Sequence, residues 1–265
     1  MLYDDYVGRF LAHERIATVS IHDRVVEGGC PYPLLRVDVP GERVVLITTG
    51  FHGEEQAGPL TLLEHLPELV AHARERGVGL RIYPCVNPSG FEAGTRYNRG
   101  GHGPNNDFLR YQVGPGRWVG ELRPGQAFTT WAEFAEGPRE TRALRRDLAG
   151  IPTPVAALDI HQDRYLAGAF HYAYVFGDPA DYRGLVERSR ALAPVPAGYA
   201  VDEWHRAGVD GLVEAHDGSI TDLFFRRGTR YLAALETTTG TPLEICHAVN
   251  RIWIRGFVDL AARAG

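Results

Sequence analysis

Hydrophobic and polar positions along the chain follow two patterns, short apolar runs and longer stretches with helical spacing. Seven short runs are rich in branched or aromatic residues and bounded by Gly, Pro or Asp, which is typical of β-strands. These predicted strands are residues 15–22, 34–39, 43–49, 80–86, 155–161, 172–176 and 230–236. Apolar residues at helical spacing predict helices at residues 56–76, 138–149, 179–192 and 242–264.

Mostly apolar strands separated by helices predict a mixed, mostly parallel sheet with helices on both faces. The expected architecture is therefore a three-layer α/β/α fold. Residues 87–137 interrupt the alternation, because they are rich in Gly and Pro and have no clean period. We expect them to form a long irregular stretch of the kind that often carries function. No segment has the composition of a linker, so residues 1–265 are expected to form a single domain.

Composition narrows the chemistry that this fold can perform. All 28 basic residues are arginine, and the chain contains no lysine. A P-loop needs a lysine at the phosphates, a Schiff-base enzyme needs an amine, and a kinase needs its strand lysine. The sequence therefore excludes all three classes.

Charge and cysteine content point away from several other classes. The formal net charge of −5 disfavours a nucleic-acid partner, since such proteins are usually basic. The three cysteines are far apart in sequence, so no disulfide framework is expected. Neither a signal-peptide pattern nor a run of 18 apolar residues is visible. We expect a soluble, cytoplasmic protein without a membrane partner.

Three residues have the types and positions of metal ligands. His52 and Glu55 follow the predicted strand 43–49 and are three positions apart, so both could bind one ion from a single turn. His161 ends the predicted strand 155–161. Open α/β sheets carry their sites at such strand ends, and catalytic zinc commonly binds two histidines and a carboxylate. The His-x-x-Glu spacing also arises by chance, so these residues alone leave the question open.

Further motifs follow in a characteristic order. They are Asn87-Pro88-Ser89-Gly90, Thr95-Arg96-Tyr97-Asn98-Arg99, Asn105-Asn106, Asp217-Gly218-Ser219 and Leu235-Glu236-Thr237. Together with the candidate ligands, they resemble the zinc carboxypeptidase family of the carboxypeptidase A type. Relatives of that family include succinylglutamate desuccinylase and aspartoacylase. The resemblance covers residues from about 45 to 260.

The resemblance implies a role for each matching residue. His52, Glu55 and His161 would bind one Zn²⁺ per chain. Glu236 would be the general base that takes a proton from the attacking water and delivers it to the leaving amine. Arg96 would help the metal to stabilise the oxyanion.

The chain departs from the family pattern in the residues that recognise the substrate. The family has an Asn-Arg pair whose arginine binds a terminal carboxylate, whereas this chain has Asn105-Asn106, and an asparagine supplies no positive charge. Val213 replaces a tyrosine that covers the substrate, and Gly103 replaces the aspartate that orients the first histidine. Asp159 is one candidate for that orienting role.

Several other charged residues lie close in sequence to the site motifs. Arg99, Arg110 and Arg164 could meet a substrate carboxylate, although a structural role is expected for each. The same holds for His216 as a pocket residue. His65 and His72, on the predicted helix 56–76, are expected to be ordinary surface or packing residues.

These observations predict a zinc-dependent hydrolase of amide or peptide bonds, resembling a metallocarboxypeptidase. Its substrate would be a peptide or an N-acyl amino acid. A deacylase of small N-acyl amino acids is the second interpretation. A non-catalytic zinc or peptide-binding module is the third, and the retained Glu236 argues against it.

Overall fold

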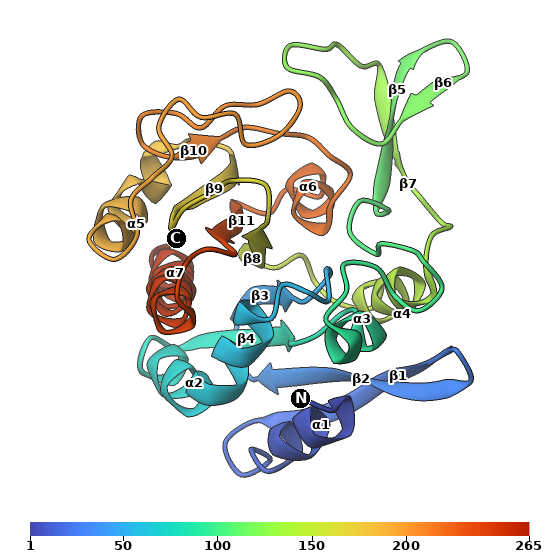
Figure 1. The fold of residues 1–265 in the computed structure, drawn as a ribbon, viewed down its shortest axis with the longest axis vertical. Helices are drawn as coiled ribbons and strands as arrows, with labels where there is room; N and C mark the ends of the chain where they lie inside the picture. The colour runs from blue at the N-terminus through green and yellow to red at the C-terminus, as the bar shows by residue number, and fades with distance from the viewer. Residues whose placement is uncertain (265) are drawn as a thin grey trace.

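The computed structural model describes residues 1–264 and is built around an eight-stranded mixed sheet (Figure 1). Its strand order is β1-β2-β4-β3-β8-β11-β9-β10. The central strands β4, β3, β8 and β11 are parallel, whereas β2 pairs antiparallel with β4 and β9 pairs antiparallel with β11. The strands are β1 Thr18–Glu27, β2 Cys30–Val39, β3 Arg43–Thr49, β4 Val78–Tyr83, β8 Ala156–Asp163, β9 His171–Phe176, β10 Leu212–Val213 and β11 Tyr231–Thr238.

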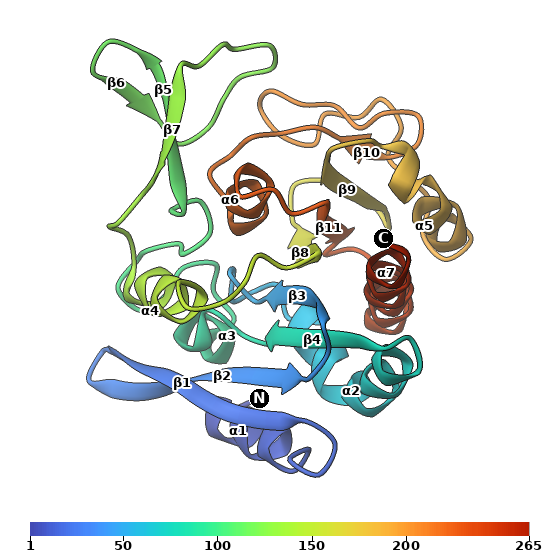
Figure 2. The same cartoon turned by 180° about the vertical axis from the view of Figure 1, so that it is seen from behind.

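Helices cover both faces of this sheet, which confirms the predicted three-layer α/β/α architecture (Figures 1 and 2). On one face, α2 (Ala57–Glu75), α5 (Ala180–Arg190) and α7 (Leu243–Arg263) enclose the larger hydrophobic core. On the other face, α4 (Arg139–Leu148) and α6 (Ile220–Arg226) enclose a second core.

The central strand β8 shows how the sequence assigns its residues to the two faces. Side chains alternate along a strand, so residues two apart share a face. Ala156, Leu158 and Ile160 pack into the larger core. Asp159 and His161 therefore point to the opposite face, where the polar residues of the site gather. The register aligns Glu236 of β11 beside His161 and Thr48 of β3 beside Asp159.

The irregular stretch expected at residues 87–137 is only partly irregular. It contains α3 (Pro88–Ala93) and a separate antiparallel sheet of order β6-β5-β7, formed by β5 (Leu109–Gly114), β6 (Arg117–Val119) and β7 (Thr130–Glu133). These strands are short, and the burial of β5 alternates only in part. Their stability comes from long-range packing of Phe108, Leu109 and Tyr111 into the second core, which local periodicity does not reveal.

The first residues also differ from the prediction. Tyr3–Leu11 form α1, which was not expected, and its Tyr3, Tyr6 and Phe10 are buried. Strand β1 begins three residues later than predicted and extends to Glu27, because it forms a hairpin with β2 across Gly28 and Gly29. Across residues 1–264, we find no helix long and apolar enough to cross a membrane.

Candidate metal centre

The loop after β3 brings His52 and Glu55 to the edge of the sheet. Gly50 turns the chain there with φ of 69°, a conformation that favours glycine. Gly53 lies so close to α3 that a Cβ would meet the carbonyl carbon of Gly90 at 1.9 Å. Only glycine fits this position, and the close contact fixes the loop that presents His52 and Glu55.

His161 approaches the same point from the end of β8. Its Nδ1 lies 2.8 Å from Oε2 of Glu55, and the rings of His52 and His161 are 5.4 Å apart between centroids. One ligand atom from each of His52, Glu55 and His161 lies within 4.8 Å of the others. All three side chains are buried. The structure thus brings together the three residues that the sequence predicted as metal ligands.

Electrostatics at this cluster favour the binding of a cation. Burial, with smaller contributions from His161 and Arg96, lowers the pKa of His52 to about 2, so this imidazole is neutral and offers a lone pair. Burial also lowers the pKa of His161, but Asp159 and Glu55 outweigh it and raise the pKa well above the ordinary value. Two carboxylates around one imidazole create a position where a proton or a metal ion is stabilised.

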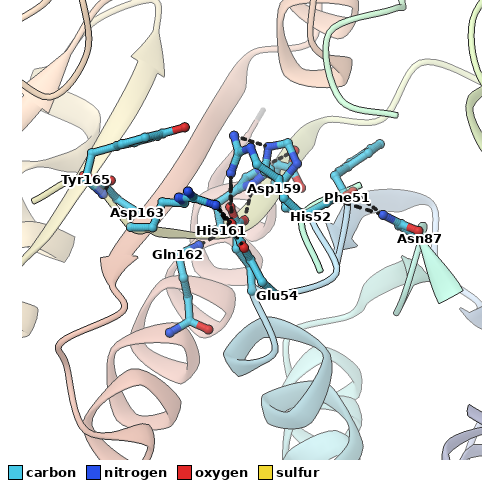
Figure 3. A network of polar contacts seen from close by, with 12 residues as sticks. Phe51, His52, Glu54, Asn87, Asp159, His161, Gln162, Asp163 and Tyr165 are labelled. Atoms are coloured by element: carbon cyan, nitrogen blue, oxygen red, sulfur yellow. Dashed lines mark hydrogen bonds and ion pairs between the residues drawn. The ribbon is translucent and has the colours of Figure 1, made fainter. Parts of the chain in front are cut away.

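Asp159 supports His161 from the other side. Its Oδ2 lies 2.8 Å from Nε2 of His161 (Figure 3). Its Oδ1 accepts a hydrogen bond from the Thr48 hydroxyl at 2.8 Å. A metal-ligating histidine normally donates its second N–H to such a carboxylate. The sequence offered Asp159 as a candidate partner of the first histidine, His52. In the structure, Asp159 contacts His161 instead. The reason is alternation, since residues 159 and 161 lie on one face of the same strand.

Arg96 lies directly against the candidate ligands. Its Nη1 is 3.2 Å from Oε1 of Glu55, and its Nη2 is 2.9 Å from Nε2 of His52. The guanidinium also lies 5.9 Å from the centre of the Tyr165 ring. A fixed positive charge therefore stands beside the cluster at the pocket wall.

Glu236 enters the same space from β11. The register places it opposite His161 on one side and Tyr172 on the other. Burial raises its pKa well above the ordinary value, His161 opposes the shift, and Glu55 adds to it. A raised pKa suits a carboxylate that must accept and release a proton near neutral pH.

The residues present fit a zinc ion. Two imidazoles and one carboxylate are the usual protein ligands of catalytic zinc, which leaves a further position for water or substrate. Among residues 1–264, Nδ1 of His52 and Oε2 of Glu236 are buried without a hydrogen-bond partner. Buried polar atoms are normally satisfied, so these two atoms are consistent with a bound ion and a reacting molecule.

A pocket of about 550 Å³ opens over the cluster and collects most of the predicted site residues. Asn105 and Asn106 line it, together with Arg96, Arg110 and Arg164.

Two of these arginines, Arg110 and Arg164, contact other groups of the protein at the pocket wall. Arg110 binds the carbonyls of Asn106 and Leu109 and stacks on Phe134, and Arg164 pairs with Glu54. Asn106 donates to Oδ2 of Asp217 at 2.9 Å.

The sequence did not indicate several pocket residues. Tyr165, Tyr172 and Tyr174 line the pocket, and so do the acidic residues Glu121 and Asp202. The tyrosines of β9 could have been found, because alternation along residues 172–174 gives them one face. Glu121 and Asp202 belong to loops whose positions depend on long-range contacts.

Two sequence candidates lie outside the pocket. The ring of His216 packs against Phe176 and Phe225 and lies 3.3 Å from Asp222, although its neighbours Ala215 and Asp217 line the pocket. Arg99 pairs with Glu92 and lies over Tyr32. Both have the structural role that we expected.

Comparison with known proteins supports the fold. No protein-family model matches the chain, and no curated protein matches its sequence. A Shewanella denitrificans structure named a "putative metallopeptidase" aligns with a TM-score of 0.76 at 22% identity, covering 98% of this chain and 90% of that one. A protein of the same name from Shewanella amazonensis gives 0.74 at 24% identity, covering 97% and 92%. A metallo-carboxypeptidase from Burkholderia cenocepacia gives 0.67 at 16% identity, covering 97% and 68%.

These likenesses establish that the chain has a metallocarboxypeptidase-like fold. The resemblance to zinc carboxypeptidases that the motifs indicated is therefore confirmed for the fold. His52, Glu55 and His161, the ligands that this resemblance implied, lie close enough together to hold a metal ion.

Proposed function

We propose that this protein is a zinc-dependent hydrolase of amide bonds, similar in chemistry to metallocarboxypeptidases. The observation that carries the proposal is the convergence of His52, Glu55 and His161 with Glu236 in one pocket. These residues come from three sheet strands or the turns after them, so a structural role alone does not explain their meeting.

Each residue has a task that its geometry supports. A zinc ion held by the three ligands would polarise the scissile carbonyl and promote the attack of water. Glu236 accepts the proton of the attacking water and transfers it to the leaving nitrogen. Arg96 offers its guanidinium to the negative charge that develops on the carbonyl oxygen. Asp159, which accepts a hydrogen bond from the Thr48 hydroxyl, contacts Nε2 of His161 directly and holds its ring in place.

The charges of the pocket bear on the substrate. Beyond the cluster, Glu121, Asp202 and Asp217 line the wall, and Asn106 is bonded to Asp217. Burial raises the pKa of Glu121. Electrostatic repulsion from Asp217 and Asp202 raises this pKa further. This part of the wall repels a terminal carboxylate, whereas Arg96, Arg110 and Arg164 supply positive charge elsewhere in the same pocket. We therefore expect the group bound at this end to be neutral or cationic.

The test is a hydrolysis assay on matched substrates. Peptides and N-acyl amino acids would be offered in sets of three, which differ only in having a carboxylate, a neutral amide or an amine beyond the scissile bond. Wild type should cleave at least one set and prefer the amide or amine form. The Glu236→Gln variant should lose about 10²–10⁴-fold in rate, the usual contribution of general acid–base catalysis.

The outcomes separate the interpretations. Cleavage of N-acyl amino acids but not peptides selects a deacylase. Binding without turnover in wild type selects a non-catalytic module. If Glu236→Gln hydrolyses as fast as wild type, the assigned base is wrong.

A further inference from the structure

A second group of metal-ligating side chains lies between two helices, away from the pocket. Glu64 and His65 belong to α2, and His247 belongs to α7. The two helices lie side by side on one face of the sheet (Figures 1 and 2). None of the three residues lines the pocket over the first cluster.

The three side chains are arranged as ligands of one ion. One ligand atom from each lies within 4.8 Å of the others. Nδ1 of His247 is 3.4 Å from Oε2 of Glu64, and the rings of His65 and His247 are 5.5 Å apart between centroids, nearly perpendicular. Neighbouring ligands of a tetrahedral zinc ion are separated by about 3.3–3.6 Å, given metal–ligand bonds of about 2.0–2.2 Å. Small side-chain movements are therefore sufficient for binding.

His247 is prepared to act as a ligand. Only 7% of its surface is exposed, and its Nδ1 lies 3.4 Å from Oε2 of Glu64. Among residues 1–264, its Nε2 has no hydrogen-bond partner, so no protein acceptor fixes the tautomer of the ring.

The surroundings leave the negative charge of Glu64 available to a cation. Arg251 of α7 pairs with Glu68 at 2.6 Å. Glu64 itself is 43% exposed at its side chain, which provides a route for an ion from solvent.

We propose that Glu64, His65 and His247 bind a divalent transition-metal ion such as Zn²⁺ and thereby join α2 to α7. Imidazole and carboxylate ligands suit zinc, copper and nickel. The site is more exposed than the first cluster, so it binds its ion more weakly. It is independent of the proposed hydrolysis, because its ligands are outside the pocket.

The experiment is a zinc titration of metal-stripped full-length protein by calorimetry. Wild type should bind two equivalents, one tight and one weak. His247→Ala should lose the weak equivalent, or bind it at least about tenfold less tightly, since even outer-shell changes weaken metal binding by 10–100-fold. The tight equivalent should remain. His65→Gln provides a second substitution at a less buried position, in case His247→Ala impairs folding.

Two controls make the result decisive. His102→Ala removes a histidine from an exposed loop and should leave both equivalents intact. His52→Ala should remove the tight equivalent and keep the weak one. A wild type that binds only the equivalent removed by His52→Ala, or a weak equivalent unaffected by both His247→Ala and His65→Gln, would overturn the proposal. If zinc binds only at the second cluster, the proposed hydrolase fails while this site stands.

Discussion

The two candidate metal sites each contain two histidines and one glutamate, but their surroundings differ. His52, Glu55 and His161 are buried at strand ends, and Asp159 and Thr48 hold His161 in place. Glu64, His65 and His247 lie between two helices, and the side chain of Glu64 is 43% exposed. Around the first group stand a pocket, an acid and an arginine, whereas none of the pocket residues belongs to the second.

This contrast indicates what separates a reactive centre from a binding site. The ligands alone determine which ion fits. The buried carboxylate that supports a ligand, the positive charge beside the cluster and the adjacent pocket determine whether chemistry can follow. Both groups are expected to bind zinc, but only the first is placed to activate a substrate.

The largest expected effect is the loss of the first metal site. Replacing Glu55 by Gln removes the only carboxylate ligand and also the partner of Nδ1 of His161. Metal retained after dialysis against a chelator should fall to background, as should hydrolysis. Glu64→Gln, the matching change in the second group, should retain the tightly bound ion and the activity. Equal losses from both variants would contradict the distinction between the groups.

Arg96 tests whether the charge beside the first group serves the reaction. In Arg96→Met the rate should fall by about 10²–10³-fold, the usual effect of removing an oxyanion donor. The metal content should be unchanged, which single-turnover rates and elemental analysis would show together. Arg99→Met changes an arginine outside the pocket and should behave as wild type. A fall in metal content that matches the fall in rate would assign Arg96 to metal retention.

The support of His161 should give a smaller effect on affinity. Asp159→Asn weakens the interaction with Nε2 of His161 while retaining a similar shape. We expect zinc to bind the first group about 10–100-fold more weakly. Thr48→Val acts one step further away and should produce a smaller change. Competition with a chromophoric chelator measures both affinities, and unchanged binding in Asp159→Asn would show that the contact does not orient the ligand.

The smallest expected effect is stabilisation through the second group. In Glu55→Gln, excess zinc can act only on Glu64, His65 and His247. A free concentration 100 times the dissociation constant stabilises the native state by about 2.7 kcal/mol, which corresponds to a rise in Tm of about 5 °C or slightly more. Adding His247→Ala to this variant should abolish the rise. A rise that persists in the double variant would place the ion elsewhere.

The sequence predicted the central strands well because each is a short, continuous and mostly apolar run, which can be recognised without knowledge of long-range contacts. Residues 43–49 form β3 without adjustment, and α7 differs from its prediction by one residue at each end. The candidate metal ligands could be predicted because the carboxyl ends of parallel strands lie at the same edge of the sheet. The small sheet of β5, β6 and β7 could not, because its strands are held by contacts of Tyr111 and Leu109 with a distant core.

The second metal group was inaccessible from the sequence for a related reason. His65 had the expected features of a surface histidine, and nothing local connects it with His247. Only the packing of α2 against α7 brings them together. The pocket acids Glu121 and Asp202 were missed similarly, since neither lies in a regular element.

The polar residues of β8 also help to specify the register in which its neighbouring strands pair with it. Asp159, His161 and Asp163 occupy alternate positions on a strand that is paired on both sides. A slip of one residue in the pairing would turn all three into the hydrophobic core under α7 and expose Leu158 and Ile160 in their place. Buried, unpaired ionisable groups are strongly unfavourable, so the misaligned sheet would be eliminated in competition with the native one. The residues that would serve turnover therefore also specify the register of the sheet.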